Sequence, residues 1–256
     1  MTEFILETRG LTKHYGGVHA LTDATFTLAR GEHVAIMGDN GAGKSTFVRQ
    51  ITGVEQPTGG QIVFDGVAHT FDSPIAAREA GIETVFQTLA LADDLDVPSN
   101  LFLGREKILF NLGPFSILDR RAMREAAMAA LVKTGVKIPN LLNTIRNMSG
   151  GQRQCVAIAR TAAFKSKLVI MDEPTAALGV QETAQVENII RTLKEAGEPL
   201  ILISHNMRQV FDLADRIVVF RRGRIVANLR KEDTDGQDVV SYITGAKTGA
   251  EYEGAA

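Results

Sequence analysis

The segment GDNGAGKS at residues 38–45 has the spacing G-x-x-x-x-G-K-[ST], and this feature constrains the fold of the chain most strongly. The apolar run at residues 34–37 precedes it, and an apolar-periodic stretch with Phe47, Val48 and Ile51 follows it. A phosphate-binding loop requires this context of strand, loop and helix. We therefore expect residues 38–45, called the phosphate loop below, to connect a buried strand to the start of a helix.

The composition of the phosphate loop indicates how it would bind a nucleotide. Its glycines allow successive backbone N–H groups to turn inward around phosphate oxygens, and the following helix N-terminus adds a favourable dipole. Lys44 can reach the β- and γ-phosphates, and the Ser45 hydroxyl can ligate Mg²⁺. The sequence thus predicts phosphate binding by Gly38, Asp39, Asn40, Gly41, Ala42, Gly43, Lys44, Ser45 and Thr46.

Apolar runs alternate with amphipathic segments along most of the chain, which is typical of an α/β fold. A helix is expected after Asp119, a good N-cap residue. The stretch from about residue 90 to 163 is richer in helical patterns, and we interpret it as a subdomain inserted in the α/β core. The tail, residues 246–256, is small and polar and is expected to be flexible. Strands are expected at 34–37, 61–64, 82–86, 168–171 and 200–203, with antiparallel strands in the first thirty residues and in 216–229.

Composition argues against several other classes of protein. The 256 residues include 28 Lys and Arg against 30 Asp and Glu, a net charge of −2, which disfavours a nucleic-acid partner held by a basic field. Glu3 and Glu7 stand where a signal peptide would carry basic residues, and no stretch approaches the ~18 apolar residues that span a bilayer. The lone cysteine, Cys155, fits a reducing compartment and is expected to be a small core residue. We expect a cytoplasmic chain whose membrane role comes through a partner.

Two carboxylates end a second apolar run, at residues 168–171. Asp172 and Glu173 are adjacent, and adjacent strand residues face different ways, so the two acids can take different roles. Paired with a phosphate loop, Asp172 would hold Mg²⁺, mostly through water, and Glu173 would polarise the attacking water. The sequence therefore indicates a nucleotide-hydrolysing site.

Residues 147–152, NMSGGQ, lie between these two motifs and resemble the signature sequence of ABC-type ATPases. Other landmarks of that family occur in order: Tyr15 resembles the aromatic residue that stacks on adenine, Gln87 the glutamine of the Q-loop, and His205 the histidine of the switch region. The resemblance covers residues 4–245. It implies a P-loop NTPase core with an N-terminal antiparallel β subdomain and an inserted helical subdomain.

The resemblance also assigns roles to the signature. Ser149 can cap the helix that follows, and the two glycines let backbone N–H groups approach an anion. In this family two domains pack head to tail, and each ATP lies between the phosphate loop of one chain and the signature of the other. The resemblance therefore implies a homodimer in which ATP meets Ser149, Gly150, Gly151 and Gln152 of a second copy.

The family pattern further implies the catalytic and metal sets. ATP and Mg²⁺ are the implied cofactors, and the side-chain carbonyl of Gln87 would join the Mg²⁺ ligands. The implied metal ligands are Ser45, Gln87 and Asp172, and the implied catalytic residues are Lys44, Glu173 and His205.

Two positions depart from the family pattern. Met148 stands where the signature usually begins with Leu, which is a conservative apolar exchange. Gly179 stands where the D-loop after the carboxylates usually has Asp. Glycine cannot make the polar contact across the dimer that Asp makes in many relatives, so this departure bears on how the two ATP sites are coupled.

Three further stretches resemble the ATPases of bacterial monosaccharide importers, the class that serves ribose, xylose, galactose and fructose. They are LFLGRE at 101–106, PTAALGVQE at 174–182 and ISHNM at 203–207. The resemblance implies a homodimer under a transmembrane permease, fed by a periplasmic or extracellular sugar-binding protein, at the cytoplasmic face of the plasma membrane. Fructose is the first guess for the sugar. Apolar residues within 87–106 would either meet the permease or pack internally.

Other members of the same family remain alternatives. An exporter ATPase, or an importer of another solute, would carry the same motifs. A soluble ABC ATPase of DNA repair or translation resembles tandem domains or domains split by long coiled coils, and this chain has no sustained heptads. A nucleotide-binding regulator without turnover is disfavoured because Lys44, Asp172, Glu173 and His205 are all present.

Overall fold

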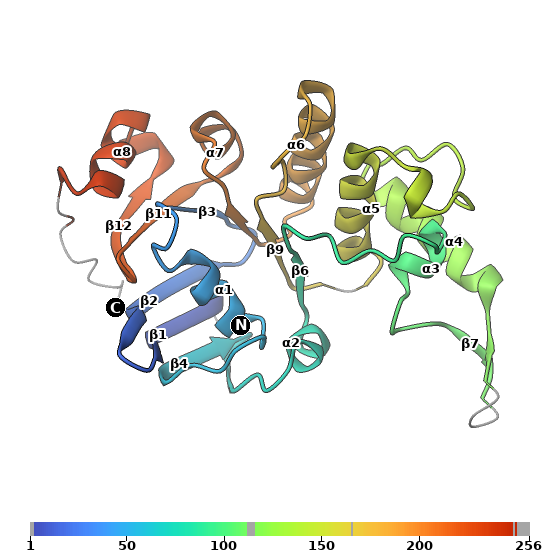
Figure 1. Ribbon diagram of the computed structural model, residues 1–256, viewed down its shortest axis with the longest axis horizontal. Coiled ribbons are helices and arrows are strands. Elements are labelled where there is room, and N and C mark those ends of the chain that lie inside the picture. Colours follow the sequence, from blue (N-terminus) through green and yellow to red (C-terminus); the bar gives the residue numbers. More distant parts are fainter. Residues whose placement is uncertain (1–2, 112–115, 165, 248, 250–256) are drawn as a thin grey trace. The chain divides into compact units, whose positions relative to one another are not determined.

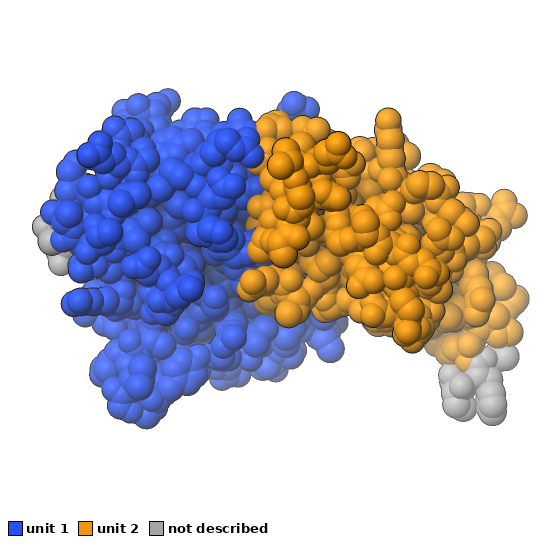
Figure 2. Space-filling model, turned by 45° about the horizontal axis from the view of Figure 1, so that its top comes forward, with its two compact units in different colours: residues 1–84, 167–173, 194–256 blue, residues 85–166, 174–193 orange. Residues whose placement is uncertain are grey.

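The computed structural model describes residues 3–111, 116–164, 166–247 and 249 (Figure 1). These residues form two compact units, of which unit 1 comprises 1–84, 167–173 and 194–256, and unit 2 comprises 85–166 and 174–193 (Figure 2). The tail expected at 246–256 lies outside the described residues except for 246, 247 and 249. Among the described residues, no helix combines the length and the apolar character that crossing a bilayer requires.

The larger sheet of unit 1 confirms the predicted α/β core. Its strands run in the order β12-β11-β3-β10-β9-β6 among the described residues. Strand β10 pairs in parallel with β3 and β9, β11 pairs in parallel with β3, and β12 is antiparallel to β11. The central strands are almost wholly buried, as parallel strands covered on both faces are. The strands are β3 (His33–Met37), β6 (Ile82–Val85), β9 (Leu168–Asp172), β10 (Leu200–Ile203), β11 (Arg216–Arg221) and β12 (Arg224–Arg230).

A second, antiparallel sheet in unit 1 has the order β2-β1-β4-β5 and confirms the predicted N-terminal strands. Phe47 of α1 packs against Phe26 of β2 and Phe220 of β11, each pair with ring centroids 5.4 Å apart. The helix therefore shares one core with both sheets. The remaining elements of unit 1 are β1 (Phe4–Tyr15), β2 (Val18–Ala29), α1 (Lys44–Ile51), β4 (Gly59–Phe64), β5 (Val67–His69), α2 (Pro74–Ala80), α7 (Met207–Leu213), the 3-10 helix η3 (Lys231–Asp233) and α8 (Gly236–Thr244).

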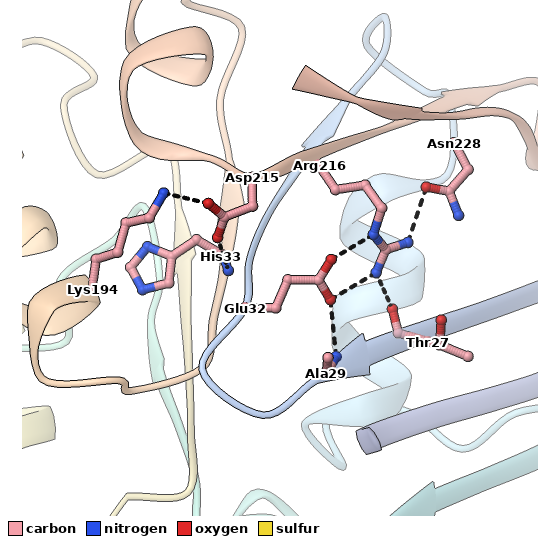
Figure 3. Close-up of polar contacts among 8 residues, drawn as sticks. All are labelled: Thr27, Ala29, Glu32, His33, Lys194, Asp215, Arg216 and Asn228. Carbon is pink, nitrogen blue, oxygen red and sulfur yellow. Dashed lines mark hydrogen bonds and ion pairs between the residues drawn. The ribbon is translucent and has the colours of Figure 1, made fainter. Parts of the chain in front are cut away.

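A partly buried ion pair anchors the chain just before β3 (Figure 3). Arg216 donates from Nε to Oε1 of Glu32 at 2.6 Å and from Nη2 to Oε2 at 3.0 Å. The same guanidinium donates to the Thr27 carbonyl at 2.6 Å and to Oδ1 of Asn228 at 2.9 Å. Because these partners lie on or beside β2, β11 and β12, the pair holds the start of β3, the strand that leads into the phosphate loop.

Unit 2 is mainly helical. Asp119 caps α4 as predicted, because Oδ1 of Asp119 accepts a hydrogen bond from the Ala122 N–H at 2.8 Å. The unit is wider than the segment expected at about 90–163, since it begins at residue 85 and takes in 174–193. Its elements are α3 (Val97–Leu101), β7 (Ile108–Phe110), β8 (Ile117–Leu118), α4 (Arg120–Lys133), the 3-10 helix η2 (Ile145–Asn147), α5 (Gly150–Ala162) and most of α6 (Val180–Glu195).

Candidate functional site

The phosphate loop connects β3 to α1 and requires glycine at two of its positions. Gly38 has φ 147°, and a Cβ there would lie 2.3 Å from the Phe220 carbonyl oxygen. Gly43, the N-cap residue of α1, has φ 107°, and a Cβ there would lie 3.0 Å from the Ala20 carbonyl oxygen. A side chain at either position would be strained, and it would collide with backbone at position 38 and press tightly on backbone at position 43. The backbone conformation of this turn therefore explains why the motif has glycine at positions 38 and 43.

The turn between β11 and β12 supports the phosphate loop, a contact that sequence analysis missed. The Gly223 N–H donates to the Ala42 carbonyl at 2.9 Å, and the Gly223 carbonyl accepts from the Thr22 N–H at 2.7 Å. Beside this turn lies a hollow of about 310 Å³, lined by Asp39, Asn40, Gly41, Ala42, Arg221, Arg222, Ile243 and Thr244. The Arg-Arg-Gly sequence of the turn was the only local signal for this support.

Lys44 stands at the first position of α1, and its amine is held by carbonyl groups at the start of the phosphate loop. Its Nζ donates to the carbonyl oxygens of Gly38 at 2.6 Å and Asp39 at 2.9 Å. Burial lowers the pKa of Lys44, and the negative charges of Glu173 and Asp172 oppose that shift. The amine therefore lies in the field of both carboxylates. Ser45 and Thr46 follow it in the first turn of α1.

The two carboxylates have different surroundings, as their adjacency predicts. Asp172 is the last residue of β9, and burial, together with the charge of Glu173, raises its pKa. Glu173 has the left-handed φ of 51°, and its N–H donates to the Ile203 carbonyl at 2.9 Å. Two neighbouring carboxylates with hard oxygen donors suit a divalent cation that would offset their repulsion.

His205 joins this group from a third segment, the one that follows β10. Its Nδ1 lies 2.8 Å from Oε2 of Glu173, and the histidine side chain is 77% exposed while that of the glutamate is 18% exposed. The structure thus brings together four residues expected in the site: Lys44, Asp172, Glu173 and His205. They lie at or after the carboxyl ends of the parallel strands β3, β9 and β10, where open α/β sheets place ligands.

Tyr15 lies at the end of β1, with 44% of the residue exposed. Its hydroxyl donates to the carboxylate of Glu55, which also pairs with Arg49 of α1 at 3.2 Å. Burial and the bond to Glu55 raise the pKa of Tyr15. Nζ of Lys13 lies 5.3 Å from the ring centroid, so this amine covers part of one ring face. Sequence analysis missed Glu55, which lies forty residues from the tyrosine.

The signature lies in unit 2, at the N-terminus of α5. Ser149 and Gln152 form a capping box, in which the Gln152 N–H donates to Oγ of Ser149 at 3.2 Å and the Ser149 N–H donates to Oε1 of Gln152 at 3.0 Å. Arg153 supports the preceding turn by donating to the carbonyl oxygens of Met148 at 3.2 Å and Arg146 at 3.1 Å. The predicted cap is confirmed, and the role of Arg153 was missed.

Gln87 also belongs to unit 2, where it is exposed after β6. The residues that follow it are tied to the far end of the signature helix. Nη1 of Arg160 donates to the Ala90 carbonyl at 3.1 Å, and Nη2 donates to the Leu89 carbonyl at 3.4 Å. One arginine therefore connects the segment after Gln87 to α5.

Glu182 of α6 packs against two glycines that the sequence singled out. A Cβ at Gly151 of the signature would lie 2.1 Å from Cγ of Glu182, and a Cβ at Gly179 would lie 2.6 Å from its Oε2. The absence of a side chain at position 179 thus makes room for this carboxylate. Cys155 is only 4% exposed, and burial raises its pKa to about 11, which confirms it as a core residue.

Comparison with known proteins shows which family and which relatives this chain is similar to. The family described as ABC transporter matches residues 21–176. The fructose import ATP-binding protein FrcA of Rhizobium meliloti is 49% identical over 96% of this chain and 95% of its own length. The xylose/arabinose import ATP-binding protein XylG of Sulfolobus acidocaldarius is 41% identical over 94% of each. The ribose import ATP-binding protein RbsA 2 of Rhizobium etli is 41% identical, and the chain spans 47% of its length.

Solved structures agree with the family match. The ADP conformation of MJ1267, an ATP-binding cassette of an ABC transporter, is similar with a TM-score of 0.80 and 27% identity, over 96% of this chain and 97% of that one. The cbiO1 protein of Clostridium perfringens is similar with a TM-score of 0.77 and 26% identity, over 96% of both chains.

Proposed function

The chain belongs to the ABC transporter family, and from this premise we propose that it is the ATP-hydrolysing subunit of an importer for a monosaccharide. The observation that carries the proposal is the convergence of Lys44, Asp172, Glu173 and His205. Glu173, with Nδ1 of His205 2.8 Å from its Oε2, can act as the general base that hydrolysis requires. The import role is supported by relatives whose names specify fructose, xylose or arabinose, and ribose import.

Each residue of the site has a task in this proposal. The phosphate loop and Lys44 bind the phosphates of ATP, and Tyr15 stacks on adenine. Ser45, Asp172 and Gln87 would hold Mg²⁺, and the bound ion would supply positive charge against the phosphates. Glu173 accepts a proton from the attacking water, while His205 contacts the γ-phosphate region.

The assembly follows the same proposal. Residues 4–245 form the ATPase domain, with about 90–163 as its helical subdomain. Two copies pack head to tail, so that the signature of one copy, residues 149–152, closes the ATP site of the other. A permease holds the dimer at the cytoplasmic face of the plasma membrane, and an external binding protein delivers the sugar. Fructose is the first candidate, because the relative named for it is 49% identical over nearly the full length of both chains.

Uptake measurements test the proposal. A strain lacking this protein is compared with the parent for uptake of labelled fructose, xylose and ribose at micromolar concentration, and is complemented with the wild type, Glu173→Gln or Glu195→Gln. Glu195 is exposed near the end of α6, away from every proposed role, and serves as the control. We expect one sugar to lose uptake, and the wild type and the control to restore it while Glu173→Gln does not. Normal uptake of all three sugars, together with ATP hydrolysis by the purified chain, would reject import of these sugars and retain the ATPase.

A further inference from the structure

Unit 2 contains a pocket of about 320 Å³ beside the signature helix α5. The end of α4 with the residues that follow it, the first turns of α5 and the middle of α6 form its walls (Figure 1). A volume of this size lies at the lower end of the ~300–1,000 Å³ range of small-molecule sites. The pocket therefore has room for a small ligand held between three helices of one unit.

The inner wall of the pocket is apolar. Val136, Cys155 and Ile189 line the pocket and are all buried. Burial raises the pKa of the Cys155 thiol to about 11, so this side chain stays uncharged at neutral pH. An apolar part of a ligand would lose its contact with water against this wall, which is a favourable transfer.

Three amide side chains line the pocket from α5 and α6. Oε1 of Gln152 accepts from the Ser149 N–H at 3.0 Å, and Oδ1 of Asn188 accepts from Nη1 of Arg191 at 2.7 Å. Neither amide nitrogen makes a hydrogen bond among the described residues, and neither does the side chain of Gln185. Because two of the oxygens already have donors, these amides mainly offer N–H groups to a ligand.

Lys137, just after α4, adds a positive charge to the pocket. It is exposed and makes no ion pair or hydrogen bond within the part of the chain that the structure describes. The lining residues in this part of the chain include no Asp and no Glu. The pocket thus combines an apolar wall with N–H donors and a single ammonium group.

These groups select the chemistry of the ligand. A carboxylate accepts hydrogen bonds through both oxygens and carries one negative charge, which matches amide donors and one ammonium. A neutral sugar fits less well, because each hydroxyl also donates a proton and the oxygens of Gln152 and Asn188 are already engaged. A phosphate group carries about −1.5 to −2 charges at neutral pH, more than one lysine offsets.

We propose that this pocket is a binding site for a small monocarboxylate with an apolar body, such as an aromatic or branched carboxylic acid. The apolar body packs on the inner wall, and the carboxylate accepts hydrogen bonds from Lys137 and from the free amide N–H groups. Because Gln152 also caps α5, the ligand contacts the signature helix at its first turn. The site lies within unit 2 and does not depend on the transported solute.

Calorimetric titration of the full-length protein with benzoate, benzamide and acetate tests the two halves of the site. Benzoate and benzamide share a ring and differ in the charge of the polar end. We expect benzoate to bind about 10-fold more tightly than benzamide, because charge-assisted hydrogen bonds are roughly twice as strong as neutral ones. Acetate lacks the ring and should bind at least about 10-fold more weakly than benzoate, since it leaves the apolar wall hydrated.

Lys137→Met locates the charge. Methionine removes the ammonium group and keeps an unbranched chain, so benzoate affinity should fall about 10-fold, to that of benzamide, while benzamide affinity stays unchanged. Lys133→Met is the matched control, since Lys133 is exposed at the end of α4 and lies outside the pocket. It should leave the affinity for both compounds unchanged.

Gln185→Leu tests the contribution of an amide from α6. It should weaken benzoate binding about 10-fold, as for the loss of a hydrogen bond to a charged group. Gln181→Leu, at an exposed position of the same helix outside the pocket, should have no effect. All four substituted side chains are exposed, so circular dichroism should be unchanged.

Three results would overturn the proposed site. The first is the absence of benzoate binding at millimolar concentration, and the second is equal affinity for benzoate and benzamide. The third is a loss of benzoate affinity in Lys133→Met as large as that in Lys137→Met, which would assign the effect to the overall surface charge.

Discussion

Nδ1 of His205 lies 2.8 Å from Oε2 of Glu173, so the two residues proposed to act at the terminal phosphate form one unit. The glutamate is mostly buried and the histidine mostly exposed. Glu173 is fixed further by its backbone bond to Ile203. The imidazole therefore takes its position from the more buried carboxylate. Substitution of Glu173 affects both the water-activating group and the orientation of His205.

Glu173→Gln should separate ATP binding from hydrolysis. The amide keeps the size of the side chain and an oxygen that can face His205, but it cannot accept a proton from water. We expect turnover to fall by about 100-fold or more, as for the loss of a general base, with ATP affinity retained. Phosphate release and calorimetric titration measure the two effects. Size-exclusion chromatography with ATP and Mg²⁺ should show a dimer, and turnover near the wild-type rate would remove Glu173 from this role.

Gly179→Asp, which introduces the residue usual in relatives, should be unfavourable in this chain. The new Cβ would lie 2.6 Å from Oε2 of Glu182, and the two carboxylates would repel each other. We expect the free energy of unfolding to fall by about 1 kcal/mol, a typical loss for a single substitution. Urea denaturation measures it, with Gly179→Ala as the control for the added Cβ alone.

A second substitution identifies the cause. Combining Gly179→Asp with Glu182→Ala removes the opposing carboxylate, and the double-mutant cycle should give a favourable coupling of up to about 1 kcal/mol, the loss caused by Gly179→Asp alone. Additive losses would show that Glu182 is not the reason for glycine at position 179.

The parts of the site that lie in one short segment are predictable from sequence, and the contacts between distant segments are not. The phosphate loop is recognisable because its strand, glycines and helix are contiguous. The contact of Tyr15 with Glu55 spans forty residues, and the packing of Glu182 on Gly151 depends on how α6 lies against α5. Such contacts leave no local pattern in the sequence, because a carboxylate from any part of the chain could occupy the same position in space.

The same reasoning applies to the fold. Apolar runs predict the buried parallel strands, because burial on both faces requires an uninterrupted apolar sequence. The inclusion of residues 174–193 in unit 2 was not predictable in this way. Periodicity identifies α6 as a helix, but it does not say which unit the apolar face of that helix will join.

Tyr15 should contribute to ATP affinity mainly through its ring. Tyr15→Ala is expected to weaken binding by about 0.5–1.5 kcal/mol, the value of one aromatic stacking contact. Tyr15→Phe should weaken it less, because the ring stays beside Lys13 and only the bond to Glu55 is lost. Calorimetric titration of both variants, with Glu55→Gln as a variant that keeps an acceptor, measures the difference. Equal losses for Phe and Ala would show that the hydroxyl, rather than the ring, determines affinity.

His33, at the start of β3, is a buried histidine that the fold keeps neutral. Its side chain lies in the cluster of Figure 3 with 1% of the residue exposed, and its Nε2 lies 3.0 Å from the Glu198 carbonyl. Nδ1 has no hydrogen-bond partner among the described residues. Burial lowers the pKa of His33 from 6.5 to about 4, the charge of Lys194 adds to that shift, and the charge of Asp215 opposes it.

This buried histidine should make the folded state sensitive to acid. The unfolded chain takes up a proton near pH 6.5, whereas the folded chain takes it up only near pH 4, so unfolding is favoured as the pH falls between these values. The loss amounts to about 3 kcal/mol once the pH is below both values, at about 1.4 kcal/mol per pKa unit. His33→Gln keeps a donor for Glu198 and should reduce the change in urea midpoint between pH 7 and pH 4.5, whereas His19→Gln, at an exposed position, should not. An unchanged pH dependence in His33→Gln would assign the acid sensitivity to other groups.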